Sequence, residues 1–401
     1  MIPLASRVAL VAESITLAVT AKANALKKAG VDVVGFGAGE PDFDTPAFVK
    51  DAAKAALDKG QTKYTPTPCF PELKAAIADK FARENGLPYK PENVTTGAGG
   101  KHCLYMAFMA VLNPGDEVLI PTPYWVSYPE QVKLAGGVPK YIPGDEKNGF
   151  RITPQQLEAA ITPKTKVLVL NSPSNPGGHA YTPDELGALA AVVVKHPNLV
   201  VFSDEIYEKL VYDGLKFVSF ATLAPGLIDQ TLTFNCHSKS FAMTGWRVGY
   251  IGGPKPVIDA INKLQSQINS HITSFIQHPA ATALTDPRGA ESVEAMRQQF
   301  EKRGKHMWER LSALPNVTCV RPQGAFYCFP NVSAYFGKSA NGVKITDAVS
   351  FAAALLEQNH VAVVPGNDSG FDTHVRLSFA TSMEQIDKGI DRTAEFLRKL
   401  T

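Results

Sequence analysis

Short runs of consecutive apolar residues, separated by longer stretches that favour helices, constrain the fold of this chain most strongly. The clearest run is Val167-Leu168-Val169-Leu170, in which no polar residue interrupts the apolar ones. Such a strand is covered on both faces, as in a parallel sheet between two layers of helices. Repeated alternation of these strands with helices predicts an α/β layered domain.

The predicted elements of this alternating part lie between residues 48 and 267. We expect strands over residues 93–96, 117–121, 166–171, 199–203, 231–235 and 247–251. We expect helices over residues 48–59, 71–85, 100–112, 183–195 and 256–267. After residue 286 the pattern changes, and a long charged helix over 290–314 leads to a smaller unit whose final helix begins at Met383.

Two domains follow from this change of pattern. We expect residues 45–286 to form a large domain with a mostly parallel sheet flanked by helices. Residues 1–44 do not fit the alternation, and we expect them to pack with residues 287–401 in a smaller α+β domain.

Composition excludes several classes of protein. The chain has 40 Lys+Arg against 38 Asp+Glu and no basic cluster, so we expect no nucleic-acid partner. The longest apolar run covers residues 189–194, far short of the roughly 20 residues that a membrane helix needs. Glu13 interrupts the apolar N-terminal stretch, which argues against a secretory signal. Five cysteines, an odd number without C-x-x-C spacing, are typical of free thiols in the cytoplasm.

Two glycine-rich segments raise the question of a phosphate or dinucleotide site. Residues 35–40 begin like a dinucleotide fingerprint, but Glu40 stands where the third glycine belongs and Pro41 follows it. Residues 97–102 end one predicted strand and open a helix, so the backbone N–H groups of Gly99, Gly100 and Lys101 would face an anion. An ordinary glycine-rich turn explains the second segment equally well.

The sharpest chemical signal is Lys239, which directly follows the predicted strand over 231–235. Arg247 opens the next strand, while Asp204 ends another and is followed by Tyr207. An amine for a Schiff base, a guanidinium for a phosphate and a carboxylate for a pyridine nitrogen are the groups that pyridoxal phosphate (PLP) chemistry requires. Taken singly, Asp204 is better read as a helix cap and Tyr207 as a core residue. Their shared place at strand ends of one sheet favours a site.

Five motifs carry a resemblance to a known family. They are SKSFAMTGWRVG at 238–249, SDEIY at 203–207, NSPSNP at 171–176, GAGEPDF at 37–43 and VRLS at 375–378. They occur along the chain in the family's order, and together they resemble the class I aminotransferases, PLP-dependent enzymes of fold type I, over nearly the whole chain. PYWVSYP at 123–129 and GGK at 99–101 are similar to the bacterial aspartate and prephenate aminotransferase branch.

The resemblance implies a role for each cofactor-contacting residue. Lys239 would bind PLP as a Schiff base and, once released, move the substrate proton. Asp204 would pair with the ring nitrogen, Tyr207 and Asn175 with the ring oxygen, and Trp125 would stack on the ring. As single residues, Asn175 also suits a turn and Trp125 a half-buried surface position.

The resemblance also implies a phosphate site shared between two subunits. Tyr64 would come from a second subunit, so a homodimer with shared active sites is expected. The other phosphate ligands would be Gly99, Gly100, Lys101, Ser238 and Arg247.

For the substrate, the resemblance implies that Arg376 clamps the α-carboxylate and that the Gly39 backbone approaches it. Lys101, assisted by Ser14, would bind the distal carboxylate of aspartate, which gives its amino group to 2-oxoglutarate and leaves as oxaloacetate. Ala12 and Glu13 stand where many relatives have Lys-Pro, and the acidic Glu13 would oppose the extra carboxylate of prephenate, so prephenate is kept only as the alternative substrate. Asn175, Trp125 and Lys101 therefore count as both cofactor- and substrate-binding.

Several departures and rivals stay open. Cys69, Gly177 and Cys236 replace residues more usual in the family, although none removes a group that the chemistry requires. The histidines form no metal-binding motif, so no metal is expected. The rival functions are an aromatic aminotransferase, a PLP β-lyase, a nicotinamide-dependent dehydrogenase and a ligand-sensing domain of the same fold.

Overall fold

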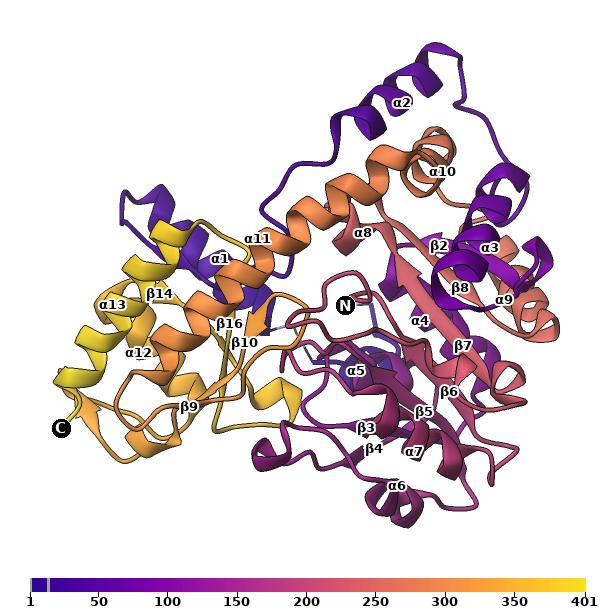
Figure 1. Ribbon diagram of the computed structural model, residues 1–401. Helices are drawn as coiled ribbons and strands as arrows, with labels where there is room; N and C mark the ends of the chain where they lie inside the picture. The colour runs from indigo at the N-terminus through magenta and orange to yellow at the C-terminus, as the bar shows by residue number, and fades with distance from the viewer. Residues whose placement is uncertain (1, 13–14) are drawn as a thin grey trace.

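A seven-stranded sheet forms the centre of the large part of the molecule (Figure 1). The computed structural model describes residues 2–12 and 15–401. The strand order is β2-β8-β7-β6-β5-β3-β4, and β8 alone in this sheet runs antiparallel to its neighbours. The strands are β2 (Val94–Ala98), β3 (Glu117–Pro121), β4 (Val138–Ile142), β5 (Thr165–Asn171), β6 (Val200–Asp204), β7 (Thr231–Cys236) and β8 (Val248–Gly252). The expected mostly parallel α/β sheet is confirmed.

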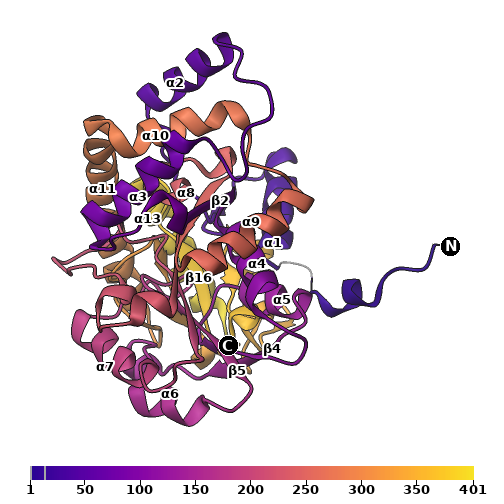
Figure 2. The same ribbon diagram turned by 90° about the vertical axis from the view of Figure 1, so that its right-hand side faces the viewer.

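Helices cover both faces of the sheet, because the central strands are apolar on both sides. One face packs against α4 (Gly100–Val111), α5 (Ser127–Leu134) and α9 (Lys255–Ile268). The other packs against α6 (Pro154–Ala160) and α7 (Pro183–Val193). At the β2–β8 edge lie α3 (Pro71–Asn85) and α10 (Gln277–Thr285), while α2 (Ala47–Asp58) extends beyond them (Figure 2).

The predicted strands and helices all occur, with ends shifted by a few residues. Edge strand β4 and the short helices α5 and α6 were not predicted. Most of β4 is exposed and Pro139 interrupts it, so it lacks the apolar run that identifies a buried strand. Helix α6 begins at a capping box between Thr153 and Gln156 and has only seven residues, too few for a clear helical period.

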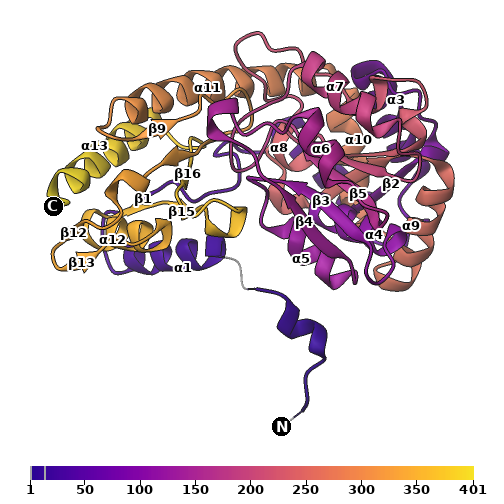
Figure 3. The same cartoon turned by 90° about the horizontal axis from the view of Figure 1, so that it is seen from below.

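Helix α11 (Pro287–Ser312) spans from the sheet to a second, smaller body (Figure 3). In that body β1 (Val34–Gly35) pairs with β14 (Val361–Ala362), which joins an early segment to the C-terminal part. The body also contains a three-stranded sheet, β10-β16-β15, and two antiparallel two-stranded sheets, β9-β11 and β12-β13. Its elements are α1 (Ile15–Lys28), β9 (Thr318–Cys319), β10 (Tyr327–Cys328), β11 (Pro330–Asn331), β12 (Ser339–Ala340), β13 (Val343–Lys344), α12 (Ala348–Asn359), β15 (Val364–Pro365), β16 (Val375–Ser378) and α13 (Met383–Lys399).

One hydrophobic cluster joins the two bodies next to the strand ends. The segment after β6 contributes Tyr207 and Tyr212 to the same buried cluster as Phe300, Phe326 and Phe379. The end of β6 is therefore held between the central sheet and the C-terminal body. Across residues 2–12 and 15–401, no helix combines the length and apolar character required to cross a membrane.

Candidate active site

The carboxyl ends of β5, β6 and β7 gather the main candidate residues at one edge of the sheet. Asn171 and Asp204 are register partners on the parallel strands β5 and β6. Lys239 lies on the short helix α8 (His237–Ser240), which follows β7 directly. Such an edge is where open α/β sheets bind ligands.

Asp204 is a buried carboxylate with unequal oxygens. Its Oδ2 accepts a hydrogen bond of 2.5 Å from the Tyr128 hydroxyl. Its Oδ1 is buried and has no hydrogen-bond partner. Burial raises the pKa of Asp204 to about 6, although the Tyr128 hydroxyl, the Ile206 N–H and the charge of Lys239 each oppose that shift. An unpaired buried oxygen costs free energy, so it marks a place where a ligand donor fits.

The Lys239 amine projects from α8 toward the early part of the chain. Its Nζ donates to the Gly39 carbonyl oxygen at 2.5 Å. The same Nζ lies 5.7 Å from the centre of the Phe326 ring. The structure therefore brings Lys239 and Gly39 together, and the contact uses the Gly39 backbone.

Arg376 joins the second group of predicted residues. It is 6% exposed, and its Nη1 donates to Asn175 Oδ1 at 3.0 Å while its Nη2 donates to the Gly37 carbonyl at 2.9 Å. Its Nε is buried without a partner. The guanidinium also lies 4.6 Å from the Tyr327 ring centre, and the Tyr327 hydroxyl is 3.2 Å from that of Tyr207.

The glycine-rich turn before α4 lies against Arg247. Gly99 has φ +84°, and a Cβ built there would lie 2.4 Å from Arg247 Nη2, so only glycine leaves room for the guanidinium. Arg247 donates to the Thr244 and Ala98 carbonyls. The Gly99 N–H, expected to face an anion, instead donates to the Gly97 carbonyl at 2.7 Å. In this structure the turn therefore closes on itself one residue before the helix.

The helix start itself keeps the geometry of an anion site. Helix α4 begins at Gly100, and its first backbone bond runs from His102 N to the Gly99 carbonyl. The N–H groups of Gly100 and Lys101 therefore belong to the positive end of the helix. Ser238 is buried on α8.

Lys101 and Trp125 form a third contact. The Lys101 Nζ lies 5.1 Å from the centre of the Trp125 ring. Burial, then repulsion by Arg247 and by Lys239, lowers the pKa of Lys101. These charges therefore act on one another, and together they suit a ligand that carries several negative groups.

Two predicted residues are not gathered with the others. Tyr64 is 90% exposed and meets His271 edge-on at 5.7 Å. Ser14 lies outside the described residues.

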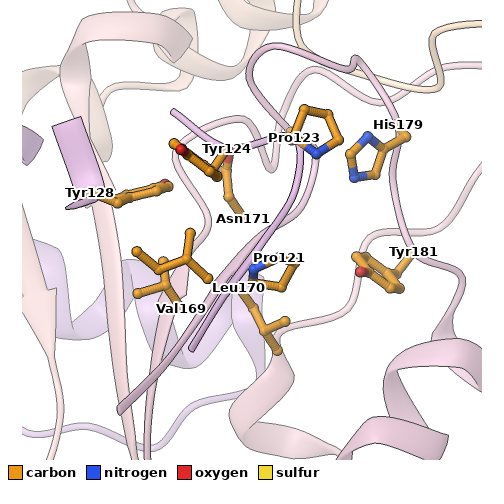
Figure 4. Close-up of a pocket in the computed structure, with 11 residues that line it drawn as sticks. Pro121, Pro123, Tyr124, Tyr128, Val169, Leu170, Asn171, His179 and Tyr181 are labelled. Carbon is orange, nitrogen blue, oxygen red and sulfur yellow. The ribbon is translucent and has the colours of Figure 1, made fainter. Parts of the chain in front are cut away.

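Sequence reasoning missed three residues that contact the predicted ones. Tyr128 binds Asp204, and Tyr327 contacts both Tyr207 and Arg376. Asn171 donates to the Asp204 carbonyl at 3.0 Å and accepts from the backbone N–H of Asn175 at 2.9 Å. Asn171 and Tyr128 line one small cavity (Figure 4). Both belong to recognised motifs, but the motifs do not reveal side-chain contacts.

The departure at Gly177 has a local explanation. A Cβ at this position would lie 2.4 Å from His179 Nδ1. His179 is buried against Phe150 and Tyr181, and burial lowers its pKa to about 3. Gly177 therefore accommodates a neutral buried imidazole.

Comparisons with known proteins agree over almost the whole chain. The family model described as "Aminotransferase class I and II" matches residues 31–392. An aspartate aminotransferase from Geobacillus stearothermophilus is 52% identical, with 98% of each chain covered. An aspartate/prephenate aminotransferase from Cereibacter sphaeroides is 50% identical, with 99% of each covered. The crystal structure of the aspartate aminotransferase from Rhizobium meliloti has a TM-score of 0.96 at 44% identity, with 100% of each covered.

Proposed function

The chain belongs to the class I and II aminotransferase family, and on that premise we propose that it is a PLP-dependent aspartate aminotransferase. It transfers the amino group of aspartate to 2-oxoglutarate in two half-reactions, giving oxaloacetate and then glutamate. The observation that carries the proposal is the convergence of Lys239 and Asp204 at one sheet edge, with Asp204 Oδ1 left without a partner.

The residues present fit PLP. Asp204 Oδ1 offers a buried acceptor for a protonated pyridine nitrogen, and Arg247 beside Gly99 offers a guanidinium for the phosphate. Gly100, Lys101 and Ser238 would supply further phosphate donors, Tyr207 and Asn175 would donate to the ring oxygen, and Trp125 would stack on the ring. Bound PLP supplies an electron sink for the carbanion that forms at the substrate Cα.

Lys239 performs the proton transfer. Its Nζ would take the proton from the substrate Cα and later deliver a proton to the C4′ atom of the cofactor, so it would act first as general base and then as general acid. Gly39 holds that amine through its carbonyl, and Arg376 orients the substrate by its α-carboxylate.

Substitution of Lys239 tests the central claim. We expect Lys239→Ala to abolish turnover and the visible absorbance of bound cofactor, with the fold retained. Lys263→Ala, which removes an exposed lysine from α9, is the matched control and should behave as the unaltered protein. Full turnover in Lys239→Ala would refute the assignment.

Substrate choice depends on two cations. Arg376 contacts Asn175 and would bind the α-carboxylate of every amino acid, so Arg376→Ala should lower kcat/KM for all of them by about 10²-fold.

Lys101 would bind the distal carboxylate, so Lys101→Ala should lower kcat/KM for aspartate by about tenfold more than for alanine. Equal losses for both amino acids with Lys101→Ala would overturn the distal assignment. Gly39 contributes backbone to the α-carboxylate, and Ser14 assists Lys101.

The active unit is a homodimer with shared sites. Support comes from Tyr64, a tyrosine 90% exposed in one chain, which the family resemblance assigns to the partner's phosphate site. Sedimentation should give a dimer. Mixed dimers of Lys239→Ala and Tyr64→Ala subunits contain one intact site, so they should exceed the activity of either parent. Absence of this complementation would contradict shared sites.

The two bodies correspond to two domains. Residues 45–286 form the large PLP-binding domain, and residues 1–44 with 287–401 form the small domain. Limited proteolysis with mass mapping should cut first near residues 44 and 286 if these boundaries are right. First cuts inside the central sheet would contradict them.

Prephenate is the second candidate substrate. It is supported by the relative that is 50% identical and is named as an aspartate/prephenate aminotransferase. The departure at Ala12 and Glu13 argues against it, and Glu13 lies outside the described residues. A panel with aspartate or glutamate as donor and prephenate or 2-oxoglutarate as acceptor separates the two activities. Turnover of prephenate at a rate comparable to 2-oxoglutarate would support the dual function.

A further inference from the structure

Tyr128 makes two contacts that no catalytic role assigned above requires. Its hydroxyl donates to Asp204 Oδ2 at 2.5 Å, and its ring meets Trp125 edge-on, with centres 5.4 Å apart and an interplanar angle of 88°. It is 2% exposed, on the first turn of α5. Figure 4 shows its ring on the wall of the cavity that Asn171 also lines. One side chain thus connects the residue assigned to the cofactor nitrogen with the residue assigned to the ring face.

We propose that Tyr128 is a positioning residue for Asp204: it fixes Oδ2 and leaves Oδ1 as the contact for the cofactor's pyridine nitrogen. The proposal rests on the function proposed above. It follows from the unequal oxygens, since Oδ2 has a short hydrogen bond and Oδ1 is buried with none. A carboxylate held by one oxygen cannot rotate freely, so its free oxygen keeps one direction.

The chemical character of Tyr128 suits this task. A phenol hydroxyl donates one hydrogen bond and supports the charged form of the acceptor. Burial and the neighbouring Asp204 carboxylate raise the pKa of Tyr128 far above its usual value. Tyr128 therefore stays neutral and stays a donor through the whole pH range in which an enzyme works.

The other groups that face Asp204 do not replace this donor. Lys239 on α8 acts on it through charge, while Cys103 on α4 and Tyr207 after β6 interact with it electrostatically. Burial raises the pKa of the Cys103 thiol and of the Tyr207 hydroxyl, so both stay neutral. Tyr128 is therefore the side-chain donor that, together with the Ile206 N–H, favours the ionised form of Asp204 before the cofactor arrives.

The test compares Tyr128→Phe with Tyr181→Phe in the full-length protein. Tyr181 is buried in the wall of the same cavity, but its hydroxyl accepts from Ile152 N and not from the acid. Affinity for PLP is titrated by absorbance over a range of pH, with circular dichroism as the check of folding. We expect Tyr128→Phe to bind PLP about tenfold more weakly. We expect Tyr181→Phe to match the unaltered protein.

The pH profile separates positioning from packing. Because Tyr128→Phe removes the donor that favours ionised Asp204, its affinity for PLP should begin to fall at a higher pH on acidification. In an Asp204→Asn background, Tyr128→Phe should cause no further change, since the two residues act as a unit.

Each outcome decides the proposal. Equal affinity and an unshifted pH profile in Tyr128→Phe would overturn it, as would equal losses in Tyr128→Phe and Tyr181→Phe. A Tyr128→Phe chain that fails to fold would also overturn it, because the proposal assigns the hydroxyl to the acid and not to the fold. If the unaltered protein takes up no PLP, the proposed function itself fails, and this result is distinct from the others.

Discussion

Asp204 and Glu205 are neighbours at the end of β6, and both are fully buried carboxyl groups, yet their surroundings differ. Asp204 has one oxygen with a donor and one without. Glu205 accepts at Oε1 from the Ser203 and Ser219 hydroxyls and the Phe220 N–H, and at Oε2 from the Asn85 amide. Asp204 therefore has one oxygen without a hydrogen-bond donor, whereas both oxygens of Glu205 have donors.

The hydrogen bonds of Glu205 continue into a buried network of Lys80, Asn85 and Glu208. Lys80 on α3 forms an ion pair with Glu208 and donates to Asn85 Oδ1 at 2.7 Å, and Asn85 donates to Glu208 Oε2 at 2.6 Å. The charge of Lys80 and the hydrogen bonds lower the pKa of Glu208 against the effect of burial. Asp204, the last residue of β6, therefore keeps a free acceptor for a ligand, while the carboxyl of Glu205 directly after it is bonded within the fold.

The largest expected effect is on kcat, when the carboxylate assigned to ligand binding, Asp204, is replaced. Asp204→Asn keeps the shape but removes the charge, so we expect kcat to fall by about 10³-fold. The free energy of unfolding should stay equal or rise, because the substitution removes a buried charge with an unpaired oxygen. Steady-state kinetics and urea unfolding measure the two quantities. A large loss of stability would erase the distinction between the two carboxyls.

The converse experiment addresses the network. Glu208→Gln removes the carboxylate nearest the buried Lys80 ammonium and leaves Glu84 Oε2, 4.0 Å away, as its remaining partner, so we expect the free energy of unfolding to fall by about 3 kcal/mol. Activity per folded molecule should change by less than about threefold. Active-site titration with PLP gives the concentration of folded enzyme by which the measured rate is divided. Lys255 and Asp259 form an exposed pair on α9, and Asp259→Asn is the matched control with little effect. Loss of activity without loss of stability in Glu208→Gln would contradict the division.

The strand sequence predicted much of this arrangement but not all of it. Apolar runs and the motif order identified the central sheet and placed Asp204 and Lys239 at its edge, because strand ends follow from local sequence. The partners Tyr128, Tyr327 and Asn85 could not be predicted, since they reach the site from α5, β10 and α3 through tertiary packing. The same limit applies to the Gly99 N–H, whose bond depends on the exact turn.

The stability of the protein should depend on pH through the buried carboxyl group of Glu205. Burial, reinforced by Glu208, raises the pKa of Glu205 from 4.5 to about 7. The fold therefore favours protonated Glu205, and this stabilisation is present below pH 4.5 and is lost as the pH rises through about 7. Glu205→Gln has no carboxyl to titrate at this position, so it does not lose this stabilisation. The free energy of unfolding of the variant minus that of the unaltered protein should therefore rise by roughly 3 kcal/mol between pH 4.5 and 7.

Urea unfolding at several pH values measures that difference. Glu185→Gln, at the capping box of α7, serves as a control outside the network. The outcome against the prediction is a difference in stability between Glu205→Gln and the unaltered protein that stays constant from pH 4.5 to 7. In that case the fold does not raise the pKa of Glu205.

The smallest expected effect tests whether the hydrogen bonds to Glu205 are redundant. Ser219 is 1% exposed and donates to Glu205 Oε1 at 2.8 Å, but the Ser203 hydroxyl at 2.9 Å and the Phe220 N–H at 3.2 Å serve the same oxygen. Ser219→Ala should therefore lower the free energy of unfolding by about 1 kcal/mol and leave kcat/KM unchanged. Ser292→Ala on α11, which removes an exposed hydroxyl bonded to a helix carbonyl, sets the baseline. A fall in kcat/KM with Ser219→Ala would mean that strain on Glu205 passes through the β6 backbone to Asp204, so that the two carboxyls act as one unit and not as two.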